Sequence, residues 1–133
     1  MTGVHVNLNP VLIFEDANLE ILVVQIKIKD ISIRVINAYG PQEYTSHEKI
    51  LCFYSVLDQV IQNAKFDSCL ILLQLDANAK VGYEIIKGDP YPQSPNGHIL
   101  MDMIERNEWI LCNAKENRDG LITRRRVTKT RKE

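Results

Sequence analysis

The feature that most constrains the fold is a pair of apolar runs separated by two polar residues. Leu19–Ile28 and Ile31–Tyr39 are rich in Ile and Val, which favour β-strands, and Gly40-Pro41 ends the second run. Two strands joined by about two residues, here Lys29-Asp30, form a hairpin. The end of the first run alternates between two faces: Val24, Ile26 and Ile28 against Gln25, Lys27 and Lys29. This alternation predicts a sheet with one half-exposed face.

Two further elements flank the hairpin. Before it, Val11–Phe14 is a short apolar run, and the polar residues 15–18 predict a turn. After it, apolar residues recur at three- and four-residue steps from His47, which predicts a helix capped by Ser46 or Thr45. The predicted buried stripe of that helix is Ile50, Phe53, Tyr54, Leu57, Val60 or Ile61, and Ala64.

The second half of the chain alternates strands and helices. Cys69–Leu75 is a continuous apolar run, typical of a strand buried on both faces. Residues 76–95 form a long loop, and a second helix starts at Asn96-Gly97 with Leu100, Met103 and Ile104 as its buried stripe. Trp109–Cys112 is predicted to be a short strand. The predicted order of strands and helices indicates a layered domain of the α/β (α+β) class.

The net charge of −1 over 133 residues hides two opposed parts. Residues 118–133 carry +5 and residues 1–117 carry −6. We therefore divide the chain into a central domain, 1–117, and a basic C-terminal segment, 118–133. The basic run of Arg124, Arg125 and Arg126 suits contact with phosphate backbones, and a solvated chain end is the alternative interpretation.

The composition also predicts the compartment. Three widely spaced cysteines, Cys52, Cys69 and Cys112, argue against a disulfide framework and for a reducing environment. No apolar run reaches the length that spans a bilayer, and no secretory signal is visible at the N-terminus. We expect an intracellular protein, nuclear or cytoplasmic, with no membrane partner.

The chemistry is expected at the end of the buried strand. The run Leu72–Leu75 leads directly into Asp76, Ala77 and Asn78. A spacing of two puts the carboxylate of Asp76 and the amide of Asn78 on one face, where together they suit a cation, a water or a phosphate oxygen. The alternative is a strand-to-loop turn in which both side chains bond local backbone.

An ordered series of short motifs carries a resemblance. A strand ends in Asn37-Ala38-Tyr39-Gly40-Pro41; a helix follows; the next strand ends in Asp76-Ala77-Asn78-Ala79; then come Asn96-Gly97, Trp109 to Asn113, and Gly120 to Arg124. This series, over roughly residues 3 to 126, resembles the endonuclease/exonuclease/phosphatase (DNase-like) family. It is most similar to the endonuclease domain that precedes the reverse transcriptase in non-LTR (LINE-type) retrotransposons.

The resemblance implies a fold and a set of roles. The fold is a partial four-layer α/β sandwich, and the activity is Mg²⁺-dependent phosphodiester hydrolysis of DNA. Asp76 then orients the attacking water, Asn78 holds the scissile phosphate, and Tyr39 contacts that phosphate. Thr123 matches the phosphate-contacting threonine of the retrotransposon variety, and Asn96 matches a recurrent, structural loop position.

Departures from the family pattern limit the expected activity. Leu75 and Ala77 stand where the family has Gly and a larger residue, and the segments that carry its metal-binding Glu and its Asp-His pair are missing at both ends. His5, His47 and His98 lie outside the matching position. We expect no metal ligand set and little or no turnover by this chain alone. The alternatives are a nucleic-acid-binding module that uses the basic segment, or a small parallel α/β enzyme of another type.

A partial sandwich also leaves strand edges and apolar faces uncovered. We therefore expect self-association through exposed sheet edges.

Overall fold

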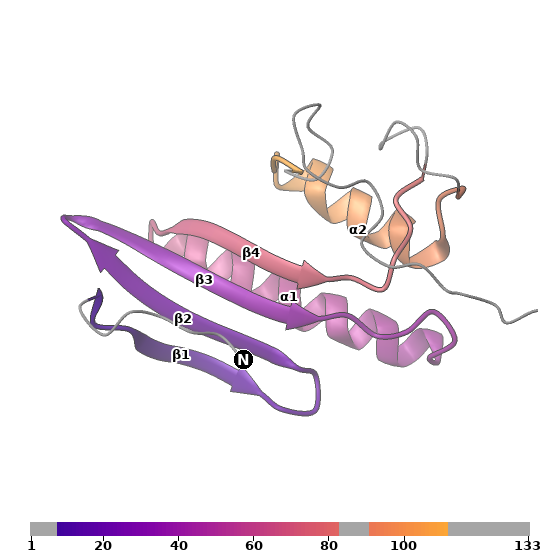
Figure 1. Ribbon diagram of the computed structural model, residues 1–133, viewed down its shortest axis with the longest axis horizontal. Helices are drawn as coiled ribbons and strands as arrows, with labels where there is room; N and C mark the ends of the chain where they lie inside the picture. Colours follow the sequence, from indigo (N-terminus) through magenta and orange to yellow (C-terminus); the bar gives the residue numbers. More distant parts are fainter. Residues whose placement is uncertain (1–7, 83–90, 112–133) are drawn as a thin grey trace, which may run out of the picture. The chain divides into compact units, whose positions relative to one another are not determined.

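A computed structural model describes residues 8–82 and 91–111 of the chain (Figure 1). The chain separates into two compact units, residues 1–79 and residues 80–133. The first unit contains a β-sheet and one long helix, and the second contains a shorter helix. The predicted boundary between residues 117 and 118 lies outside the described residues, as does the basic segment.

Four strands form one mixed sheet in the order β1-β2-β3-β4. The strands β1 (Val11–Asp16), β2 (Ile21–Ile28) and β3 (Ile31–Tyr39) pair in antiparallel fashion. The helix α1 (His47–Phe66) then returns the chain so that β4 (Leu70–Asp76) pairs with β3 in parallel. This arrangement confirms the predicted mixed α/β class. Residues 8–82 and 91–111 contain one layer of strands, so the four-layer sandwich stays a prediction.

The predicted hairpin is confirmed, and the strand before it was missed. Lys29 adopts a left-handed conformation, with φ of 56°, which a two-residue turn between twisted strands requires. The turn predicted at residues 15–18 is displaced by two residues, because β1 continues to Asp16 and the turn occupies residues 17–20. The carboxylate of Asp16 accepts hydrogen bonds of 3.0 Å from the backbone of Asn18 and Leu19, which moves the turn toward the C-terminus.

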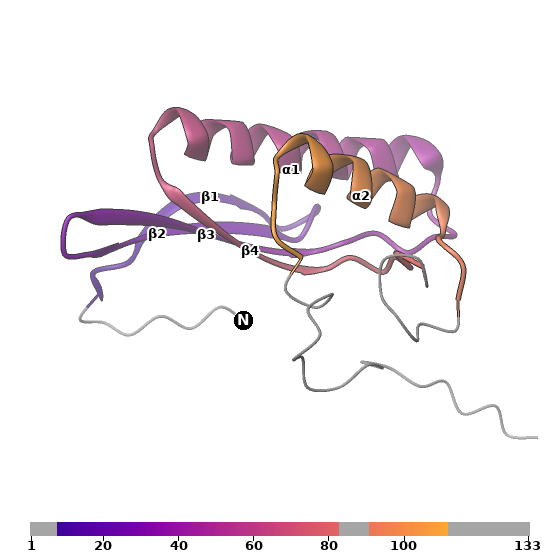
Figure 2. The ribbon, with the colours of Figure 1, turned by 90° about the horizontal axis from the view of Figure 1, so that it is seen from above.

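The helix α1 covers one face of the sheet (Figure 2). Its inward stripe agrees with the prediction: Ile50, Phe53, Tyr54, Leu57, Val60, Ile61 and Ala64 are all buried. From the sheet, Ile21 and Val23 of β2 and Ile36 and Ala38 of β3 are also buried. These four side chains are register partners in pairs, so they share one face and form the sheet half of the core.

A buried arginine joins three elements at the far end of this core. Arg34, which is 4% exposed, donates to Gln25 Oε1 at 2.8 and 3.2 Å and forms an ion pair of 2.9 Å with Asp67 after α1. Its Nη2 also lies 3.5 Å from the sulfur of Cys69. Partners on β2 and at the end of α1 therefore compensate the burial of this charge.

The prediction that the strand after α1 is buried on both faces is wrong. Burial alternates along β4, with Leu70 and Leu72 exposed and Ile71 and Leu73 half-buried. The reason is its position, because β4 is an edge strand of the sheet and α1 covers only one face. The apolar residues of β4 thus belong to a sheet of which α1 covers only one face.

The second unit contains α2 (Pro95–Arg106), close to the predicted position. Ser94 caps it by accepting a hydrogen bond from the Gly97 backbone, and the predicted stripe of Leu100, Met103 and Ile104 is buried. Asn96 lies buried in the first turn. Gly97 packs so closely on the Lys80 carbonyl that a Cβ would clash with it.

The strand predicted at Trp109–Cys112 is wrong for residues 109–111, which form no regular structure, and Cys112 lies outside the described residues. The backbone N–H of Trp109 donates instead to the carbonyl of Ile104 at 3.0 Å. The end of α2 therefore holds this segment as a helix C-terminal turn. Within the described residues, we find no helix with the length and apolar character required to cross a membrane.

Candidate functional site at the carboxyl ends of β3 and β4

The structure brings Tyr39 and Asp76 together. They are the last residues of two neighbouring parallel strands and are direct register partners, so their Cα atoms lie about 4.8 Å apart. Register partners project to the same face of a sheet. Both side chains are exposed, with 43% of Tyr39 accessible. A phenol and a carboxylate therefore stand side by side at the carboxyl edge of the sheet.

Hydrogen bonds connect the two chain segments just beyond these residues. The Gly40 N–H donates to the Asp76 carbonyl at 2.6 Å, and the Asn78 side-chain amide donates to the Gly40 carbonyl at 2.6 Å. The backbone N–H of Asn78 also lies 3.4 Å from the Asp76 carboxylate. Asn78 has a left-handed conformation, with φ of 46°, which asparagine tolerates better than most residues.

This geometry bears on the alternatives that the sequence left open. The contact of the Asn78 N–H with the Asp76 carboxylate is the local bond of a strand-to-loop turn, whereas the bond from the Asn78 side chain to Gly40 reaches a segment 38 residues away. Asn78 is two residues after Asp76, whose carboxylate faces solvent. The turn and the predicted polar site are therefore one structure, in which the amide nitrogen of Asn78 holds the backbone in place.

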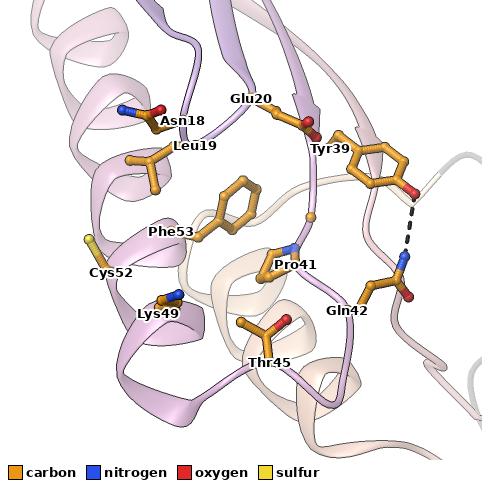
Figure 3. Close-up of a pocket in the computed structure, with 11 residues that line it drawn as sticks. Asn18, Leu19, Glu20, Tyr39, Pro41, Gln42, Thr45, Lys49, Cys52 and Phe53 are labelled. Atoms are coloured by element: carbon orange, nitrogen blue, oxygen red, sulfur yellow. Dashed lines mark hydrogen bonds between the residues drawn. The ribbon is translucent and has the colours of Figure 1, made fainter.

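Gln42 is a site neighbour that the sequence did not single out. Its side-chain amide lies 3.4 Å from the Tyr39 hydroxyl. Figure 3 shows the Tyr39 ring turned away from Leu19, Pro41 and Phe53, with its hydroxyl toward Gln42. Gly40 was quoted only as part of a motif, although a Cβ there would lie 2.6 Å from the Ala77 carbonyl. The signal in the sequence was a glycine between an aromatic residue and a proline.

A pocket of about 460 Å³ lies beside this site in the first unit. Its walls come from the β1–β2 turn, the end of β3 and the first turns of α1 (Figure 3). Leu19, Pro41 and Phe53 make it largely apolar, and Glu20 and Lys49 supply one charge of each sign. Tyr39, Gly40 and Gln42 also line the pocket, which therefore adjoins the Tyr39–Asp76 edge.

The Asp76 carboxylate is the part of this edge that could contribute to a magnesium site. Protein-bound Mg²⁺ is usually held by one or two carboxylates together with waters and substrate phosphates. Within residues 8–82 and 91–111, no three His, Cys, Asp or Glu side chains lie close enough to share a metal ion. We derive no step through a metal.

The remaining predicted site residues lie outside the described part of the chain. These are Thr123, Arg124, Arg125 and Arg126. The structure therefore assembles Tyr39, Asp76 and Asn78 into one site, and the phosphate-binding role of the basic segment remains a prediction.

Comparison of the sequence with protein-family models and with curated proteins, and of the structure with solved structures, found no match. The candidate site is therefore interpreted from its own geometry and from the motif resemblance.

Proposed function

We propose that this chain is an endonuclease-like domain of a retrotransposon polyprotein whose site binds a DNA phosphodiester but does not cleave it. The observation that carries the proposal is the pairing of Tyr39 with Asp76 at the carboxyl edge of two parallel strands. In open sheets with parallel strands, ligands bind beyond the carboxyl ends of the strands. The motif series that predicts a phosphate at Tyr39 supports the same position.

The chemistry of the described side chains is suited to binding rather than to turnover. The Tyr39 hydroxyl is a donor for a phosphate oxygen, and the Asp76 carboxylate accepts a proton or hydrogen bond from water. Hydrolysis of a phosphodiester further requires that the charge developing on the phosphate be neutralised, in this family by Mg²⁺. Within the described residues no three His, Cys, Asp or Glu side chains lie together, and this supports the proposal of a chain that binds the phosphodiester without cleaving it.

A nicking assay with Mg²⁺ on supercoiled plasmid tests the catalytic part of this proposal. We expect no cleavage above the level of an Asp76→Asn variant. Strong cleavage that the Asp76→Asn substitution removes would show that the chain is an active nuclease.

Fluorescence anisotropy with a labelled duplex tests the binding part, with Tyr39→Phe beside Tyr44→Phe as the matched control. Tyr44 is 90% exposed and lies outside the site. We expect Tyr39→Phe to weaken DNA binding several-fold and Tyr44→Phe to leave it unchanged. Equal affinity of all three proteins would exclude a phosphate contact at Tyr39.

A second candidate function is nucleic-acid binding through residues 118–133 without any role for the strand edge. The observation in its favour is the charge of +5 on this segment against −6 on the rest of the chain. Its affinity should fall steeply with salt, because each phosphate contact releases counterions. Deleting residues 118–133 should then abolish binding, whereas under the first proposal the deletion leaves the Tyr39→Phe effect in place.

Self-association is also part of the proposed behaviour of the chain. Among the strands that the structure describes, those with an unpaired edge are β1 and β4, since β2 and β3 have a neighbour on both sides. Edge strands of this kind are templates for pairing with another chain.

A further inference from the structure

Two amide side chains lie next to the Tyr39–Asp76 pair on the same face of the sheet. Asn37 of β3 and Gln74 of β4 are register partners, and we call them the amide pair. Each stands two residues before the member of the Tyr39–Asp76 pair on its own strand. Residues two apart on a strand share a face and lie about 6.6 Å apart. The candidate site therefore continues along this face as a second polar pair.

Gln74 is the more accessible member of the amide pair. It is exposed on the edge strand β4, whereas Asn37 is half-buried on the inner strand β3. A side-chain amide carries two N–H donors and a carbonyl acceptor. Gln74 therefore offers both kinds of hydrogen bond to a ligand that extends from the Tyr39–Asp76 pair.

The next row of residues behind the amide pair is aliphatic and consists of Val24, Val35 and Leu72. Leu72 is 50% exposed and stands two residues before Gln74, on the same strand and the same face. A nucleobase matches this combination, because its edge carries hydrogen-bond donors and acceptors whereas its flat faces stack on other groups. A base that lies on Leu72 can turn its edge toward Gln74.

The charges on this face disfavour a second phosphate at the amide pair. Glu15 of β1 lies in the same row of the sheet as the amide pair, and Asp76 lies in the next row. The basic residues of the four described strands, Lys27 and Arg34, lie on the other face. An uncharged group is therefore favoured over an anion at this position.

We propose that the amide pair binds the base of a nucleotide joined to the phosphate at Tyr39, with the edge of the base at Gln74 and one of its faces on Leu72. This inference rests on the proposed function, because it takes a phosphate at Tyr39 as its starting point. The spacing of about 6.6 Å between the two polar pairs lets a single nucleotide reach both. Binding then depends on a base, which contacts to phosphate alone do not read.

NMR titration of the full, isotope-labelled chain with two small probes tests the proposal. The first probe is the dinucleotide dA-dA, which carries one phosphodiester and two bases whose edges suit an amide. The second is its stable abasic analogue, which keeps the phosphodiester and lacks both bases. We expect the first probe to bind about threefold to tenfold more tightly and to shift the side-chain amide signals of Gln74.

A matched pair of glutamine substitutions assigns this preference to Gln74. Gln74→Leu should lower the affinity for dA-dA to that for the abasic probe, because it removes the amide at nearly constant size. Gln62→Leu should leave both affinities unchanged, since Gln62 is also exposed but lies on α1. Circular dichroism should show that both variants keep their helix and strand content. Should Gln74→Leu aggregate, Gln74→Ala removes the same amide without a larger apolar side chain.

The outcomes distinguish this inference from the proposed function. Equal affinity of the wild type for both probes overturns the base contact and leaves the phosphodiester site in place. A preference for dA-dA that survives the loss of the Gln74 amide also overturns it, as does an equal loss for both probes, which indicates a contact with phosphate. Tyr39→Phe should weaken both probes alike. A wild type that binds neither probe overturns the proposed function together with this inference.

Discussion

The side-chain amide of Asn78 donates a 2.6 Å hydrogen bond to the carbonyl of Gly40, and this bond joins the chain segments that leave two parallel strands. Gly40 returns a bond of the same length from its N–H to the Asp76 carbonyl. Two hydrogen bonds therefore hold the loop after β4 against the end of β3. They lie directly beyond Tyr39 and Asp76 and help to fix the relative position of these two residues.

Gly40→Ala should destabilise the first unit. A Cβ at this position would lie 2.6 Å from the Ala77 carbonyl oxygen and 2.9 Å from its carbon, and these are backbone atoms that cannot rotate away. We expect the free energy of unfolding to fall by about 1–3 kcal/mol, the usual range for overpacking. Urea denaturation followed by circular dichroism measures this change, and an unchanged midpoint would mean that the two segments are not in close contact.

Substitutions of Asn78 separate its hydrogen bond from its backbone conformation. Asn78→Gly removes the bond to Gly40 but tolerates the φ of 46°, whereas Asn78→Ala also has to adopt a left-handed conformation. Both variants should be less stable than the wild type, and Asn78→Ala should be less stable than Asn78→Gly by about 1 kcal/mol. The same denaturation experiment ranks the three proteins. The reverse order of the two variants would contradict the observed conformation.

The sequence predicted correctly the elements that are covered on one face only, because their apolar residues repeat with the period of that face. The stripe from Ile50 to Ala64 repeats at helical spacing, and every member is buried against the sheet. It failed for β4, because an apolar run such as Leu70–Leu73 does not distinguish an internal strand from an edge strand. It also missed β1, where the Asp16 carboxylate forms the turn two residues beyond the last apolar side chain.

The candidate site was predictable in part. Tyr39, Asp76 and Asn78 were named from motifs, and parallel pairing brings them to one edge. The contacts of Gly40 and Gln42 depend on how two segments nearly forty residues apart approach each other, and no local pattern encodes that. Arg34 illustrates the same limit, since its burial depends on partners at Gln25 and Asp67.

The ion pair between Arg34 and Asp67 should contribute more to stability than a surface ion pair. Arg34 is buried while Asp67 remains half exposed, so removing the carboxylate leaves a buried guanidinium with Gln25 as its main partner. We expect Asp67→Asn to lower the free energy of unfolding by about 1–2 kcal/mol. Thermal denaturation monitored by circular dichroism checks the size of the loss.

The control for this experiment lies on α1, the helix that Asp67 follows. Asp58 accepts a long bond of 3.5 Å from Gln62, which is weak, so Asp58→Asn should change stability by less than about 0.5 kcal/mol. Equal losses for Asp67→Asn and Asp58→Asn would show that the Arg34 pair makes no special contribution. High salt should reduce the Asp67 effect only in part, because the arginine is screened from solvent.

Tyr54 presents a buried hydroxyl that has no hydrogen-bond partner among the described residues. Burial, together with the negative charge of Glu43, raises the pKa of Tyr54 from 10.0 to about 12. Since an unpaired buried hydroxyl is unfavourable, Tyr54→Phe should leave stability at neutral pH unchanged or raise it by about 1 kcal/mol. Chemical denaturation at pH 7 measures this difference.

The same substitution should change how stability depends on pH. A pKa that is higher in the folded state means that the unfolded chain loses its proton first, so the contribution of Tyr54 is complete below pH 10 and is lost as the pH rises toward about 12. Tyr54→Phe should therefore unfold less readily than the wild type at high pH, by a margin that grows above pH 10. Tyr44 is 90% exposed, so Tyr44→Phe should follow the wild-type curve. A Tyr54→Phe curve that also runs parallel to the wild type would mean that the Tyr54 hydroxyl ionises as readily in the folded chain as in the unfolded one.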